Sequence, residues 1–333
     1  MIETRRNWAG NYTYRAARLH RPETVEQIQE LVGRSRKLKA LGTRHSFNEI
    51  ADSPGDLVSL EHFTKILSLD RERLTVTVEA GVRYGYLARW LHEHGFALHN
   101  LASLPHISVG GACATATHGS GDRHGNLATA VSAMEIVTGT GEVIRLSRAQ
   151  NREQLEGAAV GLGGPGVITQ LTLNISPTFQ MQQDVYESLP LRELEHHFDQ
   201  LTNSAYSISL FTDWRNAIFN QVWVKRHTPD GISVRADPEL FGAKLATTHL
   251  HPIAGISAEN CTEQMGVSGP WFERLPHFRM DFTPSVGEEL QSEYILPRRH
   301  AFAAFCAIDQ IRTKIAPLLL ISEVRTIAAD NLW

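Results

Sequence analysis

Apolar positions in the first half of the chain alternate between helical and strand spacing. Helical spacing over 22–33 predicts a helix that Pro22 can begin and Gly33 can end, and a second helix is predicted over 84–94. Short apolar or alternating runs predict strands at 38–41, 57–60, 74–79 and 167–175, and a hairpin over 133–146. Helices and strands are therefore mixed along this half.

Beyond residue 178 the composition changes, and longer loops rich in proline and histidine separate the apolar segments. Strands are predicted at 207–211 and 221–225, and one long helix at 297–316. This mixture lacks the regular strand–helix rhythm of a doubly wound sheet. We therefore predict an α+β protein of two domains, 1–178 and 179–333.

Length and composition narrow the function without identifying it. A chain of 333 residues is long enough for two cores. The net charge of -4 gives no reason to expect nucleic acid or an anionic membrane as partner, and no apolar run is long enough to span a membrane. The 3 cysteines are far apart, which excludes a disulfide framework and a paired-cysteine zinc site. We expect a cytoplasmic protein, because the N-terminus also lacks the apolar segment of a secretion signal.

The segment from Gly161 to Gly166 (GLGGPG) matches the glycine pattern of a dinucleotide-binding loop, but its surroundings do not. Such a loop needs a strand before it, a helix that opens at it, and an acidic residue about 20 positions later. Here Pro165 lies within the segment, a predicted strand follows, and the acid at that distance, Asp184, lies beyond Pro177. We interpret the segment as a turn that leads into a strand.

Two stretches of small residues are candidates for binding a cofactor that carries phosphate. Residues 103–121 contain hardly any charge, and their backbone N–H groups and hydroxyls can line a surface around a pyrophosphate. A buried layer of small packing residues is an equally good interpretation. Residues 42–46 (GTRHS) form a second turn, where His45 is the only side chain able to attack an electrophilic cofactor methyl group. A lone histidine in a turn is more often a surface or capping residue.

Histidine pairs and a late charged pair are the remaining candidates. His249 and His251 would share one face of a strand, as metal ligands do, but no third ligand accompanies them. We therefore interpret them as solvated or loop-packing histidines and predict no catalytic metal. Glu323 and Arg325 would face the same side of a strand, where they can bond neighbouring hydroxyls of a polyol or form an ordinary surface ion pair. From spacing alone the ion pair is favoured.

Several of these motifs together resemble one family. NWAGN (7–11), LGTRHSFNEIAD (41–52), LASLPHISVGGACATATHGSG (101–121) and SEVRTIAADNLW (322–333) are similar to the FAD-dependent oxidases with a vanillyl-alcohol-oxidase-type (PCMH-type) FAD domain, most of all to the alditol (xylitol) oxidases. The similarity covers essentially the whole chain. It implies that 1–178 is an FAD-binding domain of two subdomains, and that 179–333 is a mixed α/β substrate-binding (cap) domain.

The resemblance also implies roles for individual residues. His45 would carry the flavin through an 8α-histidyl bond. The expected cofactor-binding residues are Ala40, Leu41, Gly42, Thr43, Arg44, His45, Ser46, Ser103, Ser108, Gly111, Thr115, Ala116, Thr117, His118 and Val167. Ser103, Glu323 and Arg325 match positions that hold substrate hydroxyls, and Glu323 and Arg325 are the expected catalytic residues.

The implied reaction is oxidation of the terminal CH–OH of an alditol, such as xylitol or sorbitol, to the aldose. Hydride passes to flavin N5, and molecular oxygen reoxidises the flavin and gives hydrogen peroxide. We expect a monomer. Family members continue beyond the position that matches Trp333 and there supply further substrate contacts, so we expect the chain to be C-terminally incomplete.

Two alternative functions follow from these features. One is a flavin-binding chain with weak or no turnover, because the family's C-terminal substrate contacts are missing. The other is an aldonolactone oxidase or dehydrogenase, which shares the histidine loop but should lack SEVR.

Overall fold

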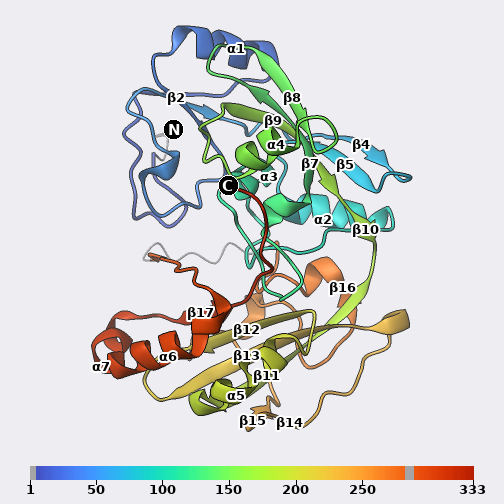
Figure 1. Ribbon diagram of the computed structural model, residues 1–333, viewed down its shortest axis with the longest axis vertical. Helices are drawn as coiled ribbons and strands as arrows, with labels where there is room; N and C mark the ends of the chain where they lie inside the picture. The colour runs from blue at the N-terminus through green and yellow to red at the C-terminus, as the bar shows by residue number, and fades with distance from the viewer. Residues whose placement is uncertain (1–4, 282–288) are drawn as a thin grey trace.

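The chain folds into two lobes that follow one another along the sequence (Figure 1). The computed structural model describes residues 5–281 and 289–333. Elements from β1 to β10 build the upper lobe in this view, and those from β11 to β17 build the lower lobe. The mixture of helices with mainly antiparallel strands confirms the α+β class. We propose residue 178, between β10 (Ser176–Pro177) and β11 (Gln180–Pro190), as the boundary between two domains.

The first lobe contains two main sheets and a short strand pair. Three parallel strands form the smaller sheet, in the order β1 (Arg18–His20), β3 (Asp56–Ser59) and β2 (Leu38–Leu41). Five antiparallel strands form the larger sheet, in the order β4 (Ile66–Asp70), β5 (Thr75–Glu79), β9 (Val167–Asn174), β7 (Val131–Val137) and β8 (Val143–Ser147). The pair joins β6 (Phe96–Ala97) to β10. The predicted strands and hairpin are confirmed, whereas β4 was not predicted.

Helices α1 (Val25–Arg34) and α2 (Tyr84–Glu93) pack their buried faces on the five-stranded sheet. The side chain of Thr24 caps α1 by accepting from the N–H of Gln27, so the helix begins later than the predicted Pro22. Helix α2 begins where predicted and ends before Gly95, whose φ of 88° few other residues adopt. Two shorter helices, α3 (Val109–Ala114) and α4 (Arg152–Ala159), complete the lobe.

The second lobe is built on a sheet of seven strands. Six follow the order β14 (Glu239–Leu240), β15 (Ala243–Leu245), β11, β13 (Ile218–His227), β12 (Ser207–Thr212) and β17 (Ser322–Arg325), and β16 (Gly269–Pro270) pairs with β11. Helices α5 (Leu194–Thr202), α6 (Ala301–Gln310) and α7 (Arg312–Ile315) pack on one face of this sheet. Alternate strand residues such as Phe211 and Trp223 point to the other face. That second face carries the polar residues described below.

One sequence prediction in the second lobe is wrong. The helix expected over 297–316 is interrupted at Ile311, and this break lets Ile315 of α7 turn back against the core. The interpretation of His249 and His251 as loop histidines is confirmed: both lie in a loop, Pro252 follows them, and they bond locally. Among the described residues, no helix is long and apolar enough to cross a membrane.

Leu87 tests the packing of α2 against the five-stranded sheet. Its side chain is fully buried, so Leu87→Ala should lower the free energy of unfolding by about 2–5 kcal/mol through the cavity it leaves. Leu67→Ala, on the exposed side of β4, is the matched control and should change that free energy by less than about 0.5 kcal/mol. Denaturant unfolding measures both, and equal losses would contradict the assigned core.

Candidate functional site

A cleft in the first lobe encloses about 990 Å³ of space, counted out into the solvent at its mouth. Three segments provide most of its lining: residues 40–46, which include the end of β2 and the loop after it, the start and end of α3, and the turn 161–166 that precedes β9. The GLGGPG segment is therefore a turn that feeds a strand, as predicted, and it also forms part of the cleft wall.

The loop 40–46 and α3 meet at their backbones. A Cβ added at Gly42 would lie only 2.9 Å from Ser108 Oγ, so the close approach requires glycine at this position. The Thr43 hydroxyl accepts from the backbone N–H of Ser108 at 3.2 Å and contacts Nδ1 of His45 at 3.1 Å. These contacts hold His45 in the wall of the cleft.

The NWAGN segment supports the same loop from behind. The ring of Trp8 stacks on His45 with 5.0 Å between centroids, and its backbone N–H donates to the carbonyl of Arg44 at 2.7 Å. The Asn7 side chain donates to the carbonyl of Ser46 at 3.0 Å. Arg44 has a φ of 65°, an uncommon backbone conformation that these neighbours hold in place.

The imidazole of His45 is neutral at pH 7. Burial, and next the nearby His106, lower the pKa of His45 to about 4. Its Nε2 is buried and, among the described residues, has no hydrogen-bond partner, and the same is true of Ser108 Oγ. Buried polar atoms normally have partners, so these two point to a ligand in the cleft.

The structure places most of the expected cofactor-binding residues along this cleft. Those that line it are Ala40, Leu41, Gly42, Thr43, Arg44, His45, Ser46, Ser108, Gly111, Thr115 and Thr117. Four others, Ser103, Ala116, His118 and Val167, are absent from its lining. Val167 is buried in β9. Fewer backbone N–H groups are available to bind a pyrophosphate than the sequence suggests. The N–H of Gly110 already donates to the carbonyl of Ala80, and that of Ala112 to the carbonyl of Ser108.

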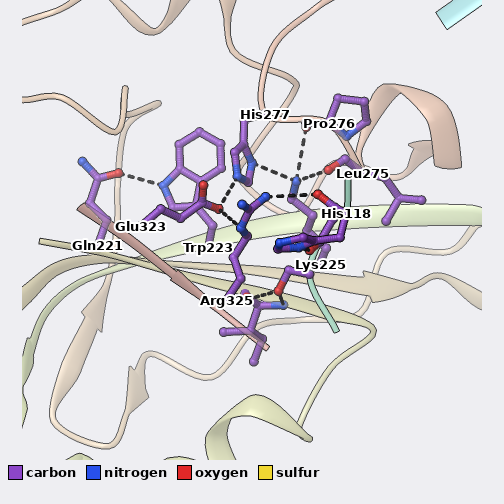
Figure 2. Close-up of polar contacts among 12 residues, drawn as sticks. His118, Gln221, Trp223, Lys225, Leu275, Pro276, His277, Glu323 and Arg325 are labelled. Atoms are coloured by element: carbon purple, nitrogen blue, oxygen red, sulfur yellow. Dashed lines mark hydrogen bonds and ion pairs between the residues drawn. The ribbon is translucent and has the colours of Figure 1, made fainter. Parts of the chain in front are cut away.

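Glu323 and Arg325 lie on β17, at the edge of the seven-stranded sheet, and face the side away from the helices (Figure 2). Oε1 of Glu323 is 3.7 Å from Nε of Arg325, and only 20% and 18% of their side chains are exposed. Although burial opposes it, Arg325 and then His277 hold the pKa of the Glu323 carboxyl well below its usual range. A simple ion pair on a solvated strand, which spacing alone favoured, is therefore excluded by burial.

This charged pair is connected to the first lobe in two ways. Nη1 of Arg325 donates to the carbonyl of His118 at 3.2 Å, and His118 directly follows the cleft residue Thr117. The backbone N–H of His277 donates to the carbonyl of Ser103 at 3.1 Å, while its ring contacts Glu323. Ser103 and Glu323 thus both contact His277, and Arg325 contacts the stretch that continues from the cleft wall.

Three further residues belong to this cluster and were missed by sequence reasoning. His277 contacts Glu323, Lys225 contacts His277, and Glu293 bridges His118 and Arg325 at 3.0 and 2.9 Å. The hydrogen bond from His118 is the main cause that lowers the pKa of Glu293 to about 2. Of these three residues, only Lys225 carries a signal in the sequence, because it is a lysine at the end of the apolar strand 221–225 (QVWVK). No group of three His, Cys, Asp or Glu suited to a metal ion occurs in the described parts of the chain.

Comparisons with known proteins show which proteins the chain is similar to. A family model of an FAD binding domain matches residues 16–147. The alditol oxidase of a Streptomyces species is 49% identical over 330 residues, which cover 98% of this chain and 77% of that protein. The L-gulonolactone oxidase of Bos taurus is 33% identical over 204 residues, 60% of this chain and 46% of its own length.

Among solved structures, the cholesterol oxidase of Brevibacterium sterolicum has the same fold. It superposes with a TM-score of 0.59 at 18% identity, over 68% of this chain and 47% of the other. Because the Streptomyces enzyme matches nearly the whole chain at high identity, the family assignment rests on it. The chain belongs to the alditol oxidase family of FAD-dependent oxidoreductases.

Proposed function

We propose that the protein oxidises the terminal hydroxyl of a small alditol, such as xylitol or sorbitol, to the aldose, with FAD as cofactor and molecular oxygen as final acceptor. The placement of Glu323 and Arg325 next to the cleft carries this proposal, since Arg325 bonds the residue that follows Thr117 of the cleft wall. The identity of 49% with an alditol oxidase supports it.

The cleft residues fit FAD. Backbone and small side chains of residues 40–46 and of α3 line the cleft, and Lys39 and Arg44 add positive charge that suits a diphosphate. The buried, unpartnered Nε2 of His45 and Oγ of Ser108 are suited to a polar ligand. Of the expected cofactor residues, those along the cleft would contact FAD directly.

His45 is the attachment point for a covalent flavin in this proposal. A histidine bonds carbon through a nitrogen lone pair, which protonation removes. Burial keeps the pKa of His45 at about 4, so the lone pair is available at neutral pH. Stacking on Trp8 fixes the plane of the ring.

Glu323, Arg325 and Ser103 bind and orient the polyol. The ionised carboxylate of Glu323 accepts a hydrogen bond from one hydroxyl, and the guanidinium of Arg325 donates to its neighbour. FAD, when bound, would supply the redox chemistry by which the alcohol loses two electrons and two protons and oxygen gains them to become hydrogen peroxide. The protein supplies the geometry that places the terminal carbon beside the cofactor.

The alternative functions are less well supported. The lactone oxidases match about 30% of positions over roughly two thirds of the chain or less, whereas the alditol oxidase matches 98% of it. Glu323 accepts hydrogen bonds and Arg325 donates them. Such a pair suits two neighbouring free hydroxyls of a polyol better than the ring ester of a lactone. A flavin-binding chain without turnover is disfavoured because Glu323 and Arg325 are both present and held in place. A monomer in the cytoplasm stays a prediction.

The covalent bond can be tested by denaturing the purified protein in acid. We expect yellow colour and flavin fluorescence to remain with the wild-type chain and to be lost from His45→Ala, which has no nucleophilic ring. His62→Ala, an exposed histidine of the same lobe, is the control and should keep the flavin. Release of all flavin from the wild type would disprove the bond to His45.

The substrate role of Glu323 can be tested by steady-state assays of peroxide production. Glu323→Gln should lower kcat/KM for xylitol about 10- to 100-fold, the effect of weakening one hydrogen bond to a charged group, with flavin content unchanged. Glu239→Gln, in β14 at the opposite edge of the same sheet, is the control and should match the wild type. Unchanged kinetics in Glu323→Gln would remove this residue from the site.

A further inference from the structure

Lys225 is a buried lysine whose ammonium group has no contact with solvent. Its side chain leaves β13 on the face that carries Glu323 and is 1% exposed (Figure 2). Nζ donates to the carbonyl oxygens of Leu275 and Pro276 and lies 3.2 Å from Nδ1 of His277. An ammonium group has three N–H donors and no acceptor, so these three partners use all of them.

The contact with Lys225 determines which nitrogen of His277 carries the proton. Because an ammonium only donates, Nδ1 of His277 must accept, and the neutral ring must carry its proton on Nε2. Nε2 lies 2.8 Å from Oε1 of Glu323 and therefore donates to it. Burial, and next Lys225, lower the pKa of His277 to about 4, so the ring is neutral at pH 7.

The imidazole is also fixed in orientation. The rings of Trp223 and Phe211 contact it edge to face, with centroids at 5.1 and 5.4 Å. The backbone N–H of His277 donates to the carbonyl of Ser103. His277 therefore contacts two of the residues that we assign to substrate binding, one through its backbone and one through its ring.

We infer that Lys225 and His277 are positioning residues for polyol oxidation: Lys225 fixes the tautomer of His277, and His277 aims the carboxylate of Glu323 at the substrate hydroxyl. This inference rests on the proposed function for its substrate. The His277 N–H occupies Oε1 of Glu323, which orients the carboxylate so that its second oxygen can accept from the polyol. Neither positioning residue needs to touch the substrate.

The arrangement implies a pH dependence. Burial lowers the pKa of Lys225 to about 7, while Glu323 opposes that shift. The charged or titratable groups that face Lys225 are Glu323, Arg325, Cys261 and His277. Above its pKa, the amine has two N–H donors for three acceptors, so Nδ1 of His277 is no longer held as an acceptor. We expect kcat/KM for the polyol to fall as pH rises through the pKa of Lys225.

Three variants of the FAD-loaded protein test the inference with xylitol as substrate. His277→Gln keeps an N–H for Glu323 and an oxygen for Lys225, His277→Phe keeps only ring volume, and Lys225→Met removes the donors. With flavin content unchanged, Lys225→Met and His277→Phe should raise KM at least about tenfold, whereas His277→Gln should stay within about threefold of the wild type. Lys225→Met should also lose the fall of kcat/KM with pH.

The inference is overturned if Lys225→Met keeps both the wild-type KM and the wild-type pH profile. It is also overturned if His277→Gln is impaired as strongly as His277→Phe, because then the hydrogen bonds of the ring do not matter.

Nitrogen NMR of isotope-labelled histidine reads the tautomer in the wild type directly and needs no turnover. The resonance of His277, assigned by its loss in His277→Gln, should show a protonated Nε2 and a bare Nδ1 below the pKa of Lys225. A protonated Nδ1 would overturn the inference even if xylitol is oxidised. Failure to oxidise any alditol, with the expected tautomer present, would instead contradict the proposed function.

Discussion

The contact of residues 103–121 with both lobes is the constraint on which the site depends. The stretch contributes α3 to the wall of the cleft, and it also bonds the second lobe, since His118 accepts from Arg325 and Gly121 donates to Thr326. Two layers of backbone approach closely here. A Cβ on Gly121, whose φ is 137°, would lie 2.5 Å from a backbone oxygen of the second lobe. The small residues therefore form both part of the cleft wall and the junction of the lobes.

Burial sets the protonation state of several groups in the cleft and at this junction. His45 in the cleft and His277 at the junction are both kept neutral by desolvation. Glu323 is kept ionised despite its burial, because Arg325 and His277 stabilise the carboxylate. The neutral ring of His277 and the charged carboxylate of Glu323 thus lie side by side, and the difference comes from the partners of each group.

Short-range patterns account for what the sequence predicted. Apolar spacing located α2 and the hairpin of β7 and β8, because such spacing depends on residues a few positions apart. Helix α3 was missed, since its glycines disfavour a helix and only packing stabilises it. Lys225 and His277 are 52 positions apart and meet only through the fold. The family resemblance placed the loop 40–46 along the cleft, but it could not separate the residues that line the cleft from buried neighbours such as Val167.

The central claim is that a polyol held by Glu323 and Arg325 reduces a flavin held at His45. Addition of xylitol to the oxidised, FAD-loaded protein under anaerobic conditions tests this claim most directly, because it follows the cofactor and needs no acceptor. The account predicts that the visible flavin absorbance bleaches and returns when oxygen is admitted. Absorbance that stays unchanged with xylitol and sorbitol, while an aldonolactone bleaches it, would contradict the account.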